Sequence, residues 1–115
     1  MKIGIKRAYE EVSDNDGYRV LVDRLWPRGV SKEKLALDEW CKDIAPSTEL
    51  RKWFDHIAER FTEFREKYRD ELRASSVPAE LLKRAQSHTQ LTLVYGAKDP
   101  EINHAVVLRE YLKSA

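Results

Sequence analysis

Residues 91–95, Leu-Thr-Leu-Val-Tyr, decide the fold of this chain. Nearly every position is apolar or β-branched, which is typical of a strand that is covered on both faces and lies at the centre of a sheet. A turn follows at residues 96–100, and the pattern beyond it predicts a helix that reaches about Lys113, with Asp99 as its cap and Pro100 at its first position. The chain therefore ends in a strand, a turn and a helix.

Two more strands are predicted near the beginning of the chain. Residues 2–7 place Ile3 and Ile5 on one side and charged residues or glycine on the other, which is the pattern of a half-exposed edge strand. A turn cluster at residues 13–17 precedes a β-branched run at residues 18–22. Pro27 and Gly29 then predict a loop after this second strand.

The segment between the second strand and residue 91 is predicted to be rich in helix. Apolar residues recur at steps of three and four from Leu50 to Leu72, behind a helix start at Pro46 and Ser47, and this stripe is compatible with a bend at residues 56–59. A second helix is expected over residues 77–85. Residues 31–40 fit either a short helix or an irregular segment packed on the core.

A helical connection between two strands normally makes them parallel neighbours, so the sequence predicts an α/β fold. We expect one domain over residues 1–115, with a small, mostly parallel sheet of three or four strands and about four helices. Ligands of open parallel sheets bind beyond the carboxyl ends of the strands. The loops at residues 23–29 and 96–104 would share that edge.

Composition excludes several classes of protein. The chain has 115 residues, 42% of them hydrophobic and 36% charged, which suits one globular domain. Its 21 basic and 20 acidic residues leave a net charge of +1, so no global field favours nucleic acid or a membrane. We find no signal-peptide pattern, no stretch of about 20 apolar residues and only one cysteine, Cys41. A cytoplasmic location is therefore expected.

The loop after the second strand concentrates basic side chains around one tryptophan. Residues 18–34 hold five basic residues and two acidic ones, and Arg24, Arg28 and Lys32 flank Trp26. Planar guanidinium groups match phosphate and carboxylate oxygens, so Arg24 and Arg28 are candidate anion ligands. In the alternative interpretation, Arg24 pairs with Asp23 or Glu39, and Arg28 is merely solvated.

The loop after the last strand faces the same edge. His104 could transfer a proton near neutral pH, and we assign it a candidate catalytic role together with Asp23, which would orient Arg24 or a substrate. Asn103 at the helix start and the hydroxyl of Tyr95 are candidate ligand contacts. His104 could equally be a structural histidine bonded to a carbonyl, and Tyr95 a ring of the core.

No metal site or cofactor is predicted. His56, His88, His104 and Cys41 lack any close ligand spacing, and the chain has no glycine-rich dinucleotide, P-loop or hydrolase motif. His56 lies on the flank of the long helical stripe, where a structural role is expected. Cys41 has no neighbouring base and is interpreted as a small apolar residue.

Three strings of residues resemble the small bacterial YeaO-like proteins, a branch of the family called domain of unknown function four-eight-eight. They are residues 17–29 (GYRVLVDRLWPRG), residues 44–54 with IAPS, Leu50-Arg51 and Trp53-Phe54, and residues 95–105 with YGAKD and Asn103-His104-Ala105. The resemblance spans the whole chain, but it brings no known activity.

The resemblance also implies a difference in chemistry. Longer relatives typically carry a Cys, a Glu and a Cys-His-Arg triplet after the last strand. This chain has Tyr95, Ala97, Asn103, His104 and Ala105 at the matching positions. Only the histidine is shared, so a mechanism that uses a thiol does not transfer to this chain.

The leading hypothesis is a crevice that binds a phosphate or carboxylate compound, such as a nucleotide, and that would support a hydrolase or transferase reaction if the protein is an enzyme. A second hypothesis is a nucleic-acid-binding module in which the loop from Arg24 to Lys34 contacts the backbone and Trp26 stacks on a base. A third is an interaction protein that pairs through the stripe from Leu50 to Leu72. The number of copies in the assembly stays open.

Overall fold

Four parallel strands form one sheet in the spatial order β1-β4-β2-β3, in a computed structural model that describes residues 1–115. The strands are β1 (Lys2–Arg7), β2 (Tyr18–Leu21), β3 (Glu39–Trp40) and β4 (Gln90–Tyr95). In the register of the sheet, Leu93 of β4 lies between Ile5 of β1 and Val20 of β2. The α/β class, the central position of residues 91–95 and the edge position of the first strand are confirmed.

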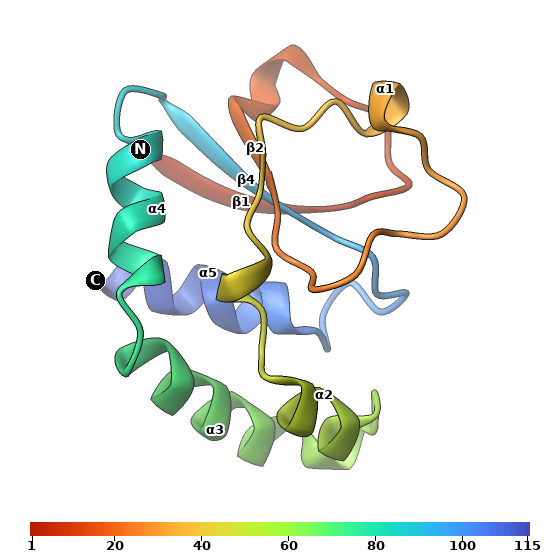
Figure 1. Cartoon of the computed structure of the whole chain (residues 1–115), viewed down its shortest axis with the longest axis vertical. Coiled ribbons are helices and arrows are strands. Elements are labelled where there is room, and N and C mark those ends of the chain that lie inside the picture. The colour runs from red at the N-terminus through yellow and green to blue at the C-terminus, as the bar shows by residue number, and fades with distance from the viewer.

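Five α-helices surround this sheet: α1 (Lys32–Leu35), α2 (Thr48–Phe54), α3 (Phe61–Arg73), α4 (Val77–Ala85) and α5 (His104–Ser114). Figure 1 shows α5 directly beneath the sheet, α3 beyond α5, and α1 on the opposite side of the sheet. None of these helices has the length and the apolar composition needed to cross a membrane.

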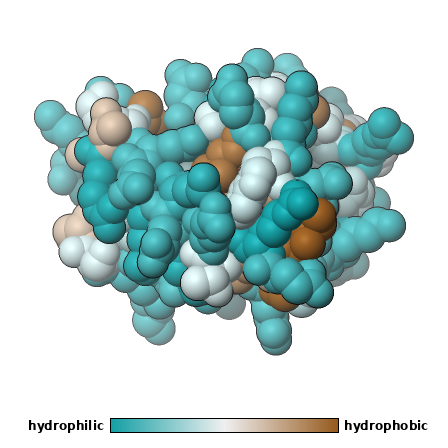
Figure 2. Space-filling view, turned by 90° about the horizontal axis from the view of Figure 1, so that it is seen from below, coloured by the Kyte–Doolittle hydropathy of each residue, from teal (hydrophilic) through white to brown (hydrophobic).

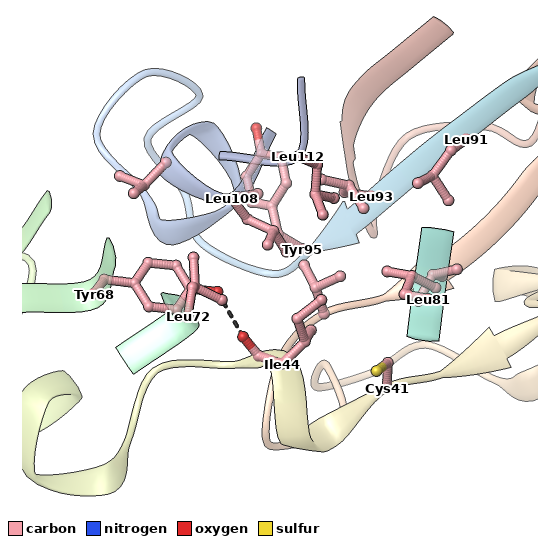
Figure 3. Packing of buried hydrophobic residues seen from close by; sticks show 14 of the residues in the cluster. Cys41, Ile44, Tyr68, Leu72, Leu81, Leu91, Leu93, Tyr95, Leu108 and Leu112 are labelled. Carbon is pink, nitrogen blue, oxygen red and sulfur yellow. Dashed lines mark hydrogen bonds between the residues drawn. The ribbon is translucent and has the colours of Figure 1, made fainter. Parts of the chain in front are cut away.

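The two faces of the sheet are covered unequally. The side chains that face the large helical layer are Val20, Val22, Leu91, Leu93 and Tyr95, whereas Leu21 and Val94 pack with Leu35 of α1. On the helical side, the buried Tyr68 of α3 donates a hydrogen bond of 2.6 Å to the carbonyl of Ile44 (Figure 3). This bond fastens α3 to the segment that leads into α2.

The apolar stripe from Leu50 to Leu72 belongs to two helices rather than one. Ser47 caps α2 as predicted, since its Oγ accepts a hydrogen bond from the N–H of Leu50. Helix α2 ends where Asp55 and His56 adopt left-handed backbone angles, with φ of 47° and 56°. The bend that the pattern allowed at residues 56–59 is therefore a complete break before α3.

Two other segments differ from the sequence prediction. Residues 31–40, for which the sequence allows either a short helix or an irregular segment, form the short α1 and the edge strand β3. The predicted start of the last helix at Pro100 is wrong, because the Asp99 carboxylate accepts the N–H groups of Glu101 and Ile102 in a separate turn. Helix α5 begins at His104, and Asn103 caps it by accepting the N–H of Val106.

A buried carboxylate, that of Asp16, joins strands β1, β2 and β4. Asp16 accepts hydrogen bonds from Lys6 of β1 at 2.9 and 3.0 Å and from Arg19 of β2 at 2.7 Å, while its backbone carbonyl accepts the hydroxyl of Thr92 in β4. Burial alone would raise the pKa of Asp16. The hydrogen bonds from Ser13, Lys6 and Arg19 outweigh burial and hold this pKa below the ordinary value of 3.8.

Replacing this carboxylate by an amide will destabilise the fold in a pH-dependent way. We expect Asp16→Asn to lower the free energy of unfolding at pH 7 by about 2–4 kcal/mol, because Lys6 and Arg19 lose their charged partner. A lowered pKa stabilises the folded state above the unfolded value and loses this effect as the pH falls through the folded value. Urea unfolding should therefore show the difference shrinking below pH 4. Asp14→Asn, in the same turn but exposed, should change little at either pH.

Candidate functional site

A pocket of about 270 Å³ lies beyond the carboxyl ends of β2 and β4. Its walls come from the loop after β2, the loop after β4, the segment that leads into α2, and the start of α5. Five of the predicted site residues line it: Asp23, Arg24, Arg28, Asn103 and His104. The structure thus brings the two predicted loops together at one edge of the sheet.

Asp23 ties these two loops to each other. Its Oδ2 accepts the backbone N–H of Gly96 at 2.8 Å, and its carbonyl accepts the indole N–H of Trp40 at 2.8 Å. A Cβ at Gly96 would lie only 3.0 Å from Oδ2, so the close approach of the loops favours glycine at that position. Asp23 does not pair with Arg24, so the expected role of orienting Arg24 is not seen.

Asp23 instead approaches His104. The Nε2 of His104 lies 3.1 Å from the carbonyl oxygen of Val22 and 2.9 Å from Asp23 Oδ1. Because both neighbours are acceptors, Nε2 carries the hydrogen, which is directed at the carbonyl, and Asp23 Oδ1 makes no aligned hydrogen bond. The Nδ1 of His104 has no hydrogen-bond partner in the protein, so a neutral imidazole keeps one nitrogen available as an acceptor.

Arg24 is held by backbone rather than by a carboxylate. Its Nη2 donates to the carbonyls of Ala45 and Pro46, each at 3.3 Å, and its buried Nε has no partner in the protein. Glu39 is unavailable to it, because Arg84 and the hydroxyl of Tyr18 bind that carboxylate. The alternative in which Asp23 or Glu39 neutralises Arg24 is therefore wrong.

Two further arginines enlarge the positive charge of the pocket. Arg28 and Arg51 are exposed, and neither makes an ion pair. The hydroxyl of Tyr9 donates to the carbonyl of Arg28 at 3.0 Å and holds the loop in place. The lining thus carries three guanidinium groups and one carboxylate, a net charge of +2 when both imidazoles are neutral.

Tyr95 and Asn103 differ from their expected roles. Tyr95 is 2% exposed, lies in the core rather than in the pocket lining (Figure 3), and burial raises the pKa of its hydroxyl. Asn103 lines the pocket, but its side-chain amide donates to the carbonyl of Asp99 and accepts from Val106. The carboxamide of Asn103 is therefore committed to shaping the start of α5.

Sequence reasoning missed Arg51 and His56 as members of the site. Both come from α2 and the break that follows it, and both line the pocket although a structural role was expected for His56. The left-handed backbone at His56 turns the chain back over the pocket, and its ring lies 6.1 Å from that of Phe54. The signal in the sequence is the string around Leu50-Arg51, which carries the family resemblance but gives no indication of an anion site.

The features behind the other two hypotheses are engaged inside the fold. The indole N–H of Trp26 donates to the carbonyl of Val30 at 2.6 Å, and its ring packs edge-on against Trp40. The stripe residues Leu50, Phe54, Phe64, Tyr68 and Leu72 are buried in the core. Figure 2 shows the molecule from below, the side on which α2 and α3 lie, and hydrophilic side chains cover most of this face.

Cys41 lies outside this pocket. It is buried, and burial together with the neighbouring Glu39 raises the pKa of its thiol to about 11. A thiol with such a pKa is a poor nucleophile at neutral pH. The structure contains no cluster of three or more side chains suited to hold a metal ion.

Comparison with known proteins places the chain among small bacterial relatives. Residues 2–115 match the family described as the inactive DUF488-N3 subclade. The chain is 48% identical over 114 residues to the uncharacterised protein YeaO of Escherichia coli K12, covering 99% of both chains. It is 42% identical over 111 residues to the uncharacterised protein Rv3073c of Mycobacterium tuberculosis H37Rv, covering 96% of this chain and 93% of the relative. No solved structure matches the chain.

Removing the carboxylate of Asp23 will separate the two loops. We expect Asp23→Ala to lower the free energy of unfolding by about 1–3 kcal/mol, since the N–H of Gly96 and the imidazole of His104 both lose a neighbour. Urea unfolding measures this loss, and the amide signal of Gly96 in a ¹H–¹⁵N spectrum should move. Asp43→Ala removes an exposed carboxylate without a contact, so an equal loss in that variant would contradict the role given to Asp23.

The break after α2 is expected to cost stability. A left-handed backbone is unfavourable for residues other than glycine, so Asp55→Gly and His56→Gly should each leave the free energy of unfolding unchanged or raise it by up to about 1 kcal/mol. Lys52→Gly, inside the right-handed turns of α2, should lower it by about 1 kcal/mol. Thermal unfolding of the three variants checks this. A loss in all three would show that the left-handed residues carry no strain.

Proposed function

Because this chain belongs to the inactive DUF488-N3 subclade, we propose that its pocket binds a small phosphate- or carboxylate-bearing anion without transforming it. The family membership agrees with the resemblance noted in residues 17–29, and it comes with a description that points away from catalysis. Anion binding requires positive charge and hydrogen-bond donors, whereas catalysis also requires reactive groups. The residues of this pocket meet the requirements of binding better.

The observation that carries the proposal is the excess of positive charge in the pocket. Arg24, Arg28 and Arg51 line it without an ion pair, and Asp23 is the single carboxylate among the lining residues. The whole molecule has a net charge of only +1, so the positive potential is local. Guanidinium groups bind phosphate and carboxylate oxygens with two parallel hydrogen bonds, which suits an anionic ligand.

An unsatisfied hydrogen-bonding atom supports the same conclusion. Two buried side-chain atoms of the protein lack a hydrogen-bond partner, Asp23 Oδ1 and Arg24 Nε, and both belong to residues that line the pocket. Buried polar atoms are nearly always paired in native proteins, so such exceptions call for an explanation. A ligand with acceptor oxygens would explain Arg24 Nε, which is a donor. Asp23 Oδ1 is itself an acceptor that lies 2.9 Å from His104 Nε2, so it gives no support for an anion.

The lining lacks the usual groups of covalent catalysis. No serine, threonine or cysteine side chain lines the pocket, and Tyr95, Ala97 and Asn103 stand where the resemblance places Cys, Glu and Cys in longer relatives. His104 beside Asp23 could still exchange a proton, but no serine, threonine or cysteine is available for it to activate.

The proposal predicts that the exposed arginines control affinity. We expect the double variant Arg28→Gln, Arg51→Gln to bind phenyl phosphate and benzoate at least roughly tenfold more weakly than the parent protein, measured by calorimetry at low salt. The melting temperature should stay within a few degrees, because neither side chain makes a contact that holds the fold.

The control variant is Arg69→Gln, which removes one positive charge on α3 outside the pocket. It should change the affinity by much less than the double variant. Equal weakening by Arg69→Gln, or a parent protein that binds neither anion at millimolar concentration, would show that the pocket is not an anion site.

A further inference from the structure

Exposed apolar side chains gather at the mouth of the pocket. The chain has four large hydrophobic residues that are exposed, and two of them, Tyr9 at 45% and Leu25 at 61%, line the pocket. A site for a bare inorganic ion has no use for such a rim, because burying apolar surface stabilises a complex only when the ligand has apolar surface to bury.

Neighbouring residues position both members of this apolar rim. The hydroxyl of Tyr9 donates to the carbonyl of Arg28, and the guanidinium group of Arg7 lies over its ring at 4.9 Å from the ring centre. Leu25 stands between Arg24, whose Nη2 is bonded to Ala45 and Pro46, and Trp26, whose indole is bonded to Val30. Tyr9 is thus held by two contacts of its own side chain, whereas Leu25 is positioned only through its neighbours in the chain.

The charge of the lining sets the charge of the best ligand. With neutral imidazoles, the lining has a net charge of +2. A carboxylate or a sulfate ester brings one negative charge, and so does each phosphate of a nucleic-acid backbone. A phosphate monoester brings nearly two above its second pKa of about 6, together with three acceptor oxygens.

We propose that the pocket takes an organic phosphate monoester in its dianionic form, with the phosphoryl group at Arg24, Arg28 and Arg51 and an apolar or aromatic group against Tyr9 and Leu25. This inference rests on the proposed function and adds the chemical class of the ligand. The inference requires both parts of the ligand, because the arginines would bind the phosphate and the exposed rim would contact the organic group.

The test compares four small molecules by calorimetry at pH 8 and low salt: phenyl phosphate, phenyl sulfate, benzoate and inorganic phosphate. Phenyl sulfate has nearly the same shape as phenyl phosphate but one charge fewer, and inorganic phosphate has the charge without the ring. We expect phenyl phosphate to bind roughly tenfold more tightly than each of the other three, a difference of about 1.4 kcal/mol.

Variants separate the two parts of the ligand. Leu25→Ser should weaken phenyl phosphate several-fold while leaving inorganic phosphate unchanged, and Val12→Ser, at an exposed residue outside the pocket, should change neither. Leu25 is largely exposed, so its variant should fold, which a thermal melt checks.

The outcomes test separately the preference for a dianion, the need for an organic group and the anion site itself. If phenyl sulfate or benzoate binds as tightly as phenyl phosphate, the preference for a dianion is wrong, although the pocket remains an anion site. If inorganic phosphate binds as tightly as phenyl phosphate, or Leu25→Ser has no effect, the inference that the ligand carries an apolar organic group is wrong. If none of the four binds, the proposed function fails together with the inference.

Discussion

The Asp23 carboxylate is the contact on which the candidate site depends. Parallel strands deliver their following loops to one edge of a sheet, but they do not fix the distance between those loops. Asp23 does so by accepting the N–H of Gly96 with one oxygen and placing the other 2.9 Å from the imidazole of His104. The hydrogen bond from His104 Nε2 to the carbonyl of Val22 holds the start of α5 against the end of β2. Together, the Asp23–Gly96 and His104–Val22 bonds fix the arginines of the first loop relative to the histidine of the second.

Most of the fold could be predicted because burial leaves a periodic trace in the sequence. Residues 91–95 indicate a central strand, since a strand covered on both faces has no polar alternation. The pattern allows a bend at residues 56–59 but does not predict a complete break, because the apolar stripe continues in phase on both sides of Asp55 and His56. Proline is common at the first position of a helix, which favours a start of α5 at Pro100, whereas the Asp99 turn and the Asn103 cap, which decide the start, depend on side-chain hydrogen bonds.

The site could be predicted only in part, because the rule for parallel sheets places only the loops that follow the strands. Asp23, Arg24, Arg28, Asn103 and His104 follow directly from the rule that loops after parallel strands meet. Arg51 and His56 enter the pocket from α2, which is joined to the sheet by no such rule and reaches this edge only through tertiary packing. Tyr95 was misplaced because a residue at the end of a strand can face either side, and the pleat of β4 directs it into the core with Leu91 and Leu93.

Several locally unfavourable features occur around the pocket, although the left-handed Ala36 and the exposed Val12 lie elsewhere. Elsewhere, buried charges are fully paired, as in the contacts of Asp16 with Lys6 and Arg19. The pocket instead collects the unpartnered atoms of Asp23 and Arg24, the left-handed backbone of His56 and the exposed side chain of Leu25. A sequence under selection for stability alone would remove such features one by one. The local excess of positive charge and the unpaired Arg24 Nε are the two of these features on which the proposed anion site rests.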